Sequence, residues 1–252
     1  MILTLAAKAL KAVLPGPVRR TLQRARQRSG LAERAFAGLS TQGVFEKIYR
    51  TGAWGKDSDG AATSGSGAHN QAIIAPYIAE VARLMSAPDI RVAVDLGCGD
   101  FNVGKHFVDV CDSYIACDIA DTVLDMNRAR HQAASLTFRR LDIAEDDLPA
   151  GDIAFVRQVL QHLSNAEIAK FVRKLNADKP YGYLLVTEHL PAKDFVPNID
   201  KPTGAECACI GAAASISARR RSRSISSTAR SCSTCFSPRA ASTPQSKRCS
   251  TA

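Results

Sequence analysis

The last 49 residues of the chain, 204–252, contain no leucine, valine, methionine, tyrosine, tryptophan, aspartate or asparagine. Twelve of these residues are serine, seven are arginine and five are cysteine. So few large apolar residues cannot supply strands to a buried core, which excludes this segment from the folded domain. The abrupt change of composition is typical of a GC-rich gene read in the wrong frame. We therefore expect a frameshift near Cys207, or else a disordered, low-complexity tail.

The tail also lacks what would complete a metal site or a nucleic-acid surface. Cys232 and Cys235 have the C-x-x-C spacing of half a zinc site, but there is no second such pair and no histidine near them. The arginine cluster at residues 219–223 contains no aromatic side chain on which bases could stack. We expect no metal and no specific nucleic acid as a partner.

Acidic residues are absent from the first 28 residues, which carry seven lysines and arginines. Residues 205–252 have a net charge of +7 as well, so residues 29–204 contribute −5 to the total of +9. The high pI therefore belongs to the two ends, and it does not predict nucleic-acid binding by the middle of the chain.

No apolar run in the sequence is long enough to span a bilayer; residues 1–14 come closest. Lys8 and Lys11 lie inside this run, whereas a signal peptide carries its charge before the apolar part. We expect a cytoplasmic protein. Residues 1–28 form either an amphipathic segment in weak contact with the inner membrane surface or a solvated pair of helices.

The glycine-rich stretch at residues 91–104, RVAVDLGCGDFNVG, lacks the third glycine of a G-x-G-x-x-G dinucleotide motif. Its apolar first half predicts a buried strand, followed by a turn at Gly97 and Gly99. Asp95 and Asp100 put negative charge at this turn, which disfavours a pyrophosphate and suits a positively charged ligand. An NAD-dependent oxidoreductase is therefore the weaker alternative.

An acidic residue, Asp118, follows Gly99 by 19 positions, at the end of a second apolar segment. A carboxylate at this place can accept hydrogen bonds from both hydroxyl groups of a ribose. Strand, glycine turn, strand and acid together predict a nucleoside-binding unit.

The stretch VDLGCG resembles motif I of the class I methyltransferases, and four further segments follow in the order of that family. They are Asp118, the segment 141–143 after a strand at 136–138, the VLQHLS segment after a strand at 152–157, and a strand at 183–188. The resemblance implies S-adenosylmethionine as cofactor. It also implies a set of cofactor-binding residues: Asp95, Gly97, Cys98, Gly99, Asp118, Ile119, Asp142, Ile143 and Gln158. Asp142 could instead cap a turn.

The segment before motif I, FEKIYRTGAWG followed by SGSG, resembles a subgroup of bacterial methyltransferases. In such enzymes this segment folds over the cofactor, which implies substrate-pocket roles for Tyr49, Trp54, Ser64 and Ser66. Tyr49 and Trp54 could equally be core anchors. Helical spacing predicts helices at 41–50 and 69–85 with a Gly/Ser loop between them.

The resemblance implies methyl transfer to a small-molecule or glycan-like acceptor, with oxygen as the expected methylated atom. A hydroxyl acceptor needs a general base, for which His162, Glu188 and His189 are the candidates. His162 could instead face the cofactor without chemistry, and the other two could be solvated loop residues. A non-catalytic or defunct cofactor-binding protein is the alternative function.

The expected fold is α/β: a Rossmann-like, doubly wound, mostly parallel sheet with an N-terminal helical cap. Helices are expected at 102–110, 121–132 and 165–177, the last capped by Ser164 or Asn165. The final antiparallel strands are expected to be missing. Four segments result: a basic helical part at 1–40, the cap and Gly/Ser loop at 41–90, the core at 91–204 and the tail at 205–252.

Overall fold

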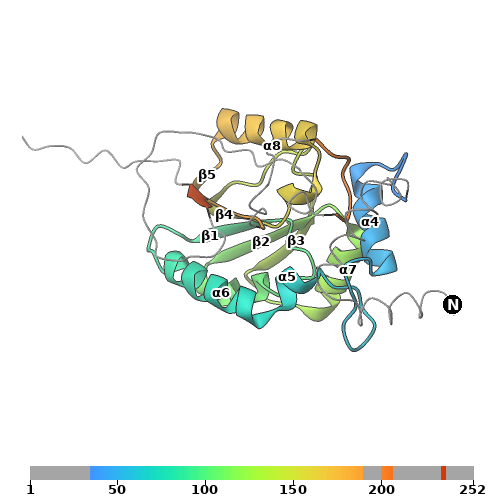
Figure 1. Ribbon diagram of the computed structural model, residues 1–252. Coiled ribbons are helices and arrows are strands. Elements are labelled where there is room, and N and C mark those ends of the chain that lie inside the picture. The colour runs from blue at the N-terminus through green and yellow to red at the C-terminus, as the bar shows by residue number, and fades with distance from the viewer. Residues whose placement is uncertain (1–34, 190–199, 207–233, 237–252) are drawn as a thin grey trace, which may run out of the picture.

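A computed structural model of the chain describes residues 35–189 and 200–206 and the backbone of 234–236. A six-stranded sheet runs through its centre in the order β3-β2-β1-β4-β5-β6 (Figure 1). The strands are β1 (Val92–Leu96), β2 (Ser113–Asp118), β3 (Leu136–Arg140), β4 (Gly151–Arg157), β5 (Tyr181–Thr187) and β6 (Thr234–Phe236). The first five are parallel, which confirms the predicted fold class.

Helices cover both faces of the sheet because the strands are apolar on both faces. Figure 1 shows α6 (Gln71–Met85) on one face and α8 (Asn165–Asp178) on the other. In β1, Ala93 packs in the core that contains α6, whereas Val94 packs in the core that contains α8. Successive strand residues point to opposite faces, so one strand supplies both cores.

The chain order of the strands reverses between β1 and β4, since β2 and β3 lie on one side of β1 and β4 and β5 on the other. The loops that leave two neighbouring strands diverge at such a point. This divergence opens a crevice at the carboxyl ends of the strands, where open α/β sheets bind ligands.

The N-terminal cap is built on α4 (Thr41–Thr51), as the helical spacing predicted. Ser40 Oγ accepts the N–H of Gly43 at its start, and Gly52 ends it with a left-handed φ of 64°. Its buried stripe, which includes Val44 and Ile48, joins the core formed with α7 (Asp121–Arg130) and α8. The cap is therefore part of the domain core rather than an appended layer.

The next cap element differs from the single helix expected at 69–85. It consists of a short turn of helix, α5 (Ser66–His69), followed by α6. Asn70 separates them because its side chain accepts the N–H of Ala72 and starts a new helix.

The prediction of a helix at 102–110 was wrong. This segment forms two short 3-10 turns, η1 (Gly104–His106) and η2 (Val108–Val110). Gly104 and three β-branched valines have low helix propensity, and Phe101 before them has a left-handed φ of 60°. The other two crossover helices were predicted correctly and are α7 and α8.

The tail contributes to the sheet, against the expectation that all final antiparallel strands are missing. Residues 234–236 form β6, which pairs antiparallel with β5. An edge strand needs only an extended backbone to pair with, so the unfavourable side-chain composition of the tail does not prevent this contact. The proposed frameshift, the thiols of Cys207 and Cys232, and residues 1–28 lie outside the described residues. Among the residues that are described, no helix has the length and apolar character needed to cross a membrane.

A half-buried carboxylate, Glu167, joins α8 to the cap. It accepts hydrogen bonds from the N–H and hydroxyl of Ser164 in a capping box, and from the hydroxyls of Thr41 and Thr203. Burial disfavours the charged form, but these hydrogen bonds outweigh it and lower the pKa of Glu167.

Replacing Glu167 with alanine is expected to lower the free energy of unfolding by about 1–3 kcal/mol, because several donors lose their acceptor. The stabilisation requires the carboxylate, so it is present above the ordinary pKa of glutamate and is lost as pH falls through the lowered value. Urea unfolding at pH 7 and pH 3 measures both effects. Glu80→Ala, on an exposed part of α6, is the control and should leave stability nearly unchanged. A loss for Glu167→Ala that is unchanged at pH 3 would contradict this account.

Candidate functional site

A cavity of about 1020 Å³, open to solvent, lies at the carboxyl ends of the strands. The cap closes one side of it, and the loops after β1, β2, β3 and β4 form the rest. It is lined by thirteen of the predicted site residues: Tyr49, Trp54, Ser64, Asp95, Gly97, Cys98, Gly99, Asp118, Ile119, Asp142, Ile143, Gln158 and His162. Ser66, Glu188 and His189 do not line it.

The two glycines of the turn after β1 allow three segments to meet. Gly97 and Gly99 have left-handed φ values of 91° and 58°. A Cβ atom at Gly97 would lie 2.3 Å from Val159 Cγ2, and one at Gly99 would lie 2.3 Å from Ser64 Oγ. Only glycine therefore satisfies both the backbone conformation and the close packing at these positions.

The Asp118 carboxylate is held in place by backbone donors at the end of β2. Its Oδ2 accepts the N–H of Gly99 at 3.0 Å, and its Oδ1 accepts the N–H of Ala120 at 3.0 Å. Burial raises the pKa of Asp118 to about 6, although these hydrogen bonds act in the opposite direction. Each carboxylate oxygen can accept more than one hydrogen bond, so both remain able to receive ligand hydroxyls.

Asp95 lies at the other side of the glycine turn and is also buried. Its Oδ2 accepts the hydroxyl of Tyr114 at 3.0 Å. Burial, reinforced by the charge of Asp118, raises the pKa of Asp95 to about 7, while Tyr114 and Arg157 act to lower it. A cationic ligand would favour the charged form of this residue.

Asp100 connects the glycine turn to the cap, a function that the sequence did not reveal. Its Oδ2 accepts the N–H of Ser64 at 2.8 Å and lies 2.5 Å from His69 Nε2. Ser64 Oγ in return accepts the N–H of Asp100 at 2.8 Å and lies 3.1 Å from the hydroxyl of Tyr49. The contacts of Asp100 with Ser64 and His69 span more than 30 residues of sequence, so no local spacing could predict them.

Asp142 both caps a turn and lines the cavity. Its Oδ1 accepts the N–H of Ala144 at 2.8 Å, so it caps a turn. It also lines the cavity beside Ile143, where the loop after β3 reaches the site.

Trp54 contacts several elements of the pocket wall. Its ring lies edge-on to Tyr49, with centroids 5.5 Å apart, and 4.9 Å from the ring of His162. Its indole N–H donates to the carbonyl of Ala205 at 3.0 Å. Trp54 therefore anchors the cap and lines the cavity at the same time.

His162 is buried in the cavity wall and is neutral. Burial, together with the charge of Lys201, lowers its pKa to about 3. Nδ1 lies 3.2 Å from the carbonyl of Gly204, and this geometry places the ring proton there. Nε2 then carries the lone pair and accepts from Gln161 Nε2 at 3.3 Å.

The other two candidate bases have different surroundings. Glu188 Oε1 accepts the N–H groups of Val159 and Leu160 at 3.1 and 2.9 Å, which supports the turn η3 (Leu160–His162). The backbone N–H of His189 donates to Gln161 Oε1, and burial lowers the pKa of its imidazole. Both are better placed to support the cavity wall than to act within it.

The sequence of residues 94–186 matches a family of proteins described as the methyltransferase domain. The doubly wound sheet and the cavity at its carboxyl edge agree with this match, and together they support a class I, S-adenosylmethionine-dependent methyltransferase domain over these residues. No curated protein matches the chain.

Several solved structures are similar at low identity. The methyltransferase domain of bacterial CtHen1 is 17% identical, over 48% of this chain and 66% of that one, with a TM-score of 0.42. CalS10, an amino pentose methyltransferase from Micromonospora echinaspora, is 20% identical over 49% and 54%, with a TM-score of 0.41. The N-methyltransferase NodS from Bradyrhizobium japonicum WM9 is 15% identical over 44% and 60%, with a TM-score of 0.40. The chain thus spans less than two thirds of each of them.

The residues that line the cavity fit a cofactor of this kind. Asp95, Asp100 and Asp118 surround the glycine turn with carboxylates, which suits an ammonium and a sulfonium group and is unfavourable for a pyrophosphate. Ile119, Leu141 and Ile143 give the apolar wall that a purine ring needs.

The raised pKa of Asp95 predicts a variant that is more stable than the natural sequence. An aspartate with an ordinary pKa of 3.8 that titrates near 7 in the folded state favours folding in its protonated form, so its contribution is lost as pH rises through 7. Asp95→Asn is expected to raise the free energy of unfolding at pH 8 by roughly 1–3 kcal/mol and to have little effect at pH 4. Thermal and urea unfolding without ligand test this, with the exposed Asp109→Asn as control. An equal change at both pH values would refute the assignment.

Proposed function

We propose that this protein transfers a methyl group from S-adenosylmethionine to a hydroxyl group of a small-molecule or glycan-like acceptor. The observation that supports it most directly is the ring of carboxylates around the glycine turn. Asp118 would receive the ribose hydroxyls, Asp95 would face the positive end of the cofactor, and Asp142 with Ile143 would hold the adenine. Gly97, Cys98 and Gly99 would let the chain approach it closely, with Ile119 and Gln158 beside them.

When bound, S-adenosylmethionine would supply a methyl group made electrophilic by its sulfonium sulfur. The protein then mainly has to hold the acceptor in line and exclude water. The cap provides Tyr49 and Trp54 for this purpose, and their rings offer flat apolar faces that suit the C–H face of a sugar.

The proton of the acceptor hydroxyl needs a destination, and His162 Nε2 is the candidate inside the cavity once the acceptor displaces the amide of Gln161 from its lone pair. A neutral imidazole with a pKa near 3 is a weak base. It is sufficient for this reaction because the hydroxyl becomes strongly acidic as its oxygen gains the methyl group. Proton transfer to the imidazole therefore accompanies the formation of the carbon–oxygen bond, so the base acts in the transition state.

Titration of S-adenosylmethionine into the purified protein by calorimetry tests cofactor binding. Asp118→Ala is expected to weaken the affinity at least tenfold, since two charge-assisted hydrogen bonds to the ribose are lost. Asp109→Ala, an exposed carboxylate outside the cavity, should bind as the wild type does. Binding of NADH in place of S-adenosylmethionine by the folded protein would overturn the proposal, and binding without turnover on any acceptor would favour a non-catalytic cofactor-binding protein.

His162→Gln is expected to lower kcat about a hundredfold once an acceptor is found, and to leave the affinity for the cofactor within about threefold, because the base acts only on the acceptor. The wild-type rate should show no fall between pH 8 and pH 5 from this residue, since it stays neutral throughout that range. Initial rates across this range measure both. A titration of kcat near pH 6.5 that disappears in His162→Gln would contradict the low pKa.

A further inference from the structure

A buried asparagine, Asn127, lies next to the glycine turn after β1. It belongs to α7, and its side chain is fully excluded from solvent. Its Nδ2 donates to the carbonyl of Gly99 at 2.7 Å. The other two buried residues of α7, Val123 and Leu124, are apolar. An amide among them needs a specific reason, because burial of a polar group is costly unless the group is hydrogen-bonded.

The orientation of the Asn127 amide follows from the Gly99 carbonyl. A carbonyl oxygen can only accept, so the Nδ2 end of the amide must face it. The Oδ1 end is then buried without a hydrogen-bond partner among the residues that the structure describes. Nδ2 also lies 4.0 Å from Cys98 Sγ, which is a weak acceptor. A leucine of similar size would leave no polar atom without a partner, so the bond to Gly99 is the contact that accounts for the amide.

Both backbone groups of Gly99 are hydrogen-bonded. Its N–H donates to Asp118 Oδ2 at 3.0 Å, and its carbonyl accepts from Asn127. The other end of the same peptide unit is the N–H of Asp100, which donates to Ser64 Oγ at 2.8 Å. Glycine can adopt many backbone conformations, so a glycine that must keep one of them, here with a φ of 58°, depends on such contacts.

The orientation of the Asp118 carboxylate depends in turn on Gly99. The N–H of Gly99 holds its Oδ2 and the N–H of Ala120 holds its Oδ1, so two backbone donors set the plane of the carboxylate. Asp118 and Gly99 line the cavity, whereas Asn127 does not. Asn127 can therefore influence a ligand only through the turn that it holds.

The helix that carries Asn127 is itself fixed at its start. Glu46 of α4 accepts the N–H groups of Asp121 and Thr122, the first two residues of α7. A carboxylate at a helix N-terminus is favourable because it meets unpaired N–H groups and the positive end of the helix dipole. Figure 1 shows α7 beside α4, in agreement with their contacts. The cap thus fixes the helix from which the amide reaches the glycine turn.

We propose that Asn127 is a positioning residue of the cofactor site: by holding the Gly99 carbonyl, it keeps the Gly99 N–H on the Asp118 carboxylate and so orients that carboxylate for the ribose hydroxyls. The inference rests on the proposed function, in that it takes S-adenosylmethionine as the ligand of the cavity. Asn127 itself makes no contact with the ligand. Its role explains why a buried amide with an unpartnered oxygen occupies the side of α7 that meets the turn.

Titration of the Asp118 carboxyl, followed by NMR of its labelled carbon, tests the positioning without any ligand. The hydrogen bond from the Gly99 N–H acts to lower the pKa of Asp118, which burial raises to about 6. In Asn127→Leu this bond should weaken, so the pKa of Asp118 should rise further. A loss of core packing alone would not act on this carboxyl. An equal pKa of Asp118 in Asn127→Leu and in the wild type would overturn the inference.

Calorimetry with S-adenosylmethionine measures the consequence for binding. Asn127→Leu is expected to weaken the affinity about five- to twentyfold. In the Asp118→Ala background the same substitution should change the affinity by less than about twofold, because its effect passes through the Asp118 carboxylate. A full additional loss in that background would show a structural role and overturn the inference. An absence of binding by the wild type would count against the proposed function, and the NMR titration would still decide the role of Asn127.

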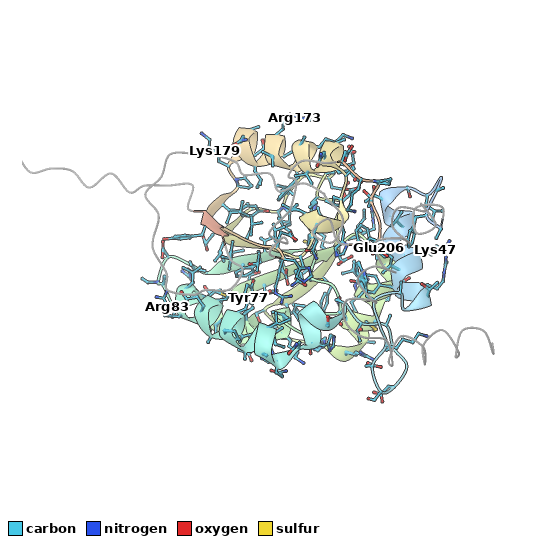
Figure 2. All side chains as sticks on the ribbon, viewed as in Figure 1. Lys47, Tyr77, Arg83, Arg173, Lys179 and Glu206 are labelled. Carbon is cyan, nitrogen blue, oxygen red and sulfur yellow. The ribbon has the colours of Figure 1, made fainter. Side chains whose placement is uncertain are left out.

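Two further variants complete the test. Asn176→Leu, at an exposed position of α8 between the labelled Arg173 and Lys179 (Figure 2), is the matched control and should keep the wild-type pKa of Asp118 and the wild-type affinity. Asn127→Ala repeats both measurements with a smaller side chain and should act as Asn127→Leu does. Failure of both Asn127 variants to fold would show that the residue serves the core alone, and this result would also overturn the inference.

Discussion

The convergence of three chain segments on one glycine turn is the constraint on which the site depends. Val159 packs against Gly97, Ser64 packs against Gly99, and the Asp118 carboxylate accepts the N–H of Gly99. Each contact brings in a different element: the loop after β4, the cap, and the end of β2. Because Gly97 and Gly99 have no side chains, the neighbouring segments can pack directly against the backbone of the turn, and this packing positions the walls of the cavity.

The cavity contains buried charged groups, although burial normally disfavours the charged form of a side chain. Carboxylates at Asp95 and Asp118 are buried so far that their pKa values rise to about 7 and about 6. A buried acid of this kind lowers the stability of the unliganded protein at neutral pH, and a cationic ligand would restore it. Arg157 adds a largely buried cation to the wall of the same cavity. Among the described residues, the site therefore holds buried groups of both charges.

The cap closes one side of the cavity and so gives the pocket its shape. Its helix α4 is packed into the domain core, and its loop is bound to Asp100 through Ser64 and His69. Trp54 links the cap to His162 and to Ala205. Because Ser64 of the cap packs against Gly99 and is hydrogen-bonded to Asp100, the positions of the cap and of the glycine turn depend on each other.

The sequence by itself determined the class of a doubly wound, mostly parallel sheet, the glycine turn and the acid at Asp118, because these depend on local periodicity and on spacings within one supersecondary unit. It could not show that residues 102–110 form 3-10 turns or that three tail residues pair with β5, since tertiary packing decides short segments of weak propensity. It also could not tell which of the candidate bases lines the cavity. Only the fold shows that His162 lines it whereas Glu188 does not, and only the fold brings Arg157 to the cavity that Gly97 borders, because both depend on contacts between segments far apart in the chain.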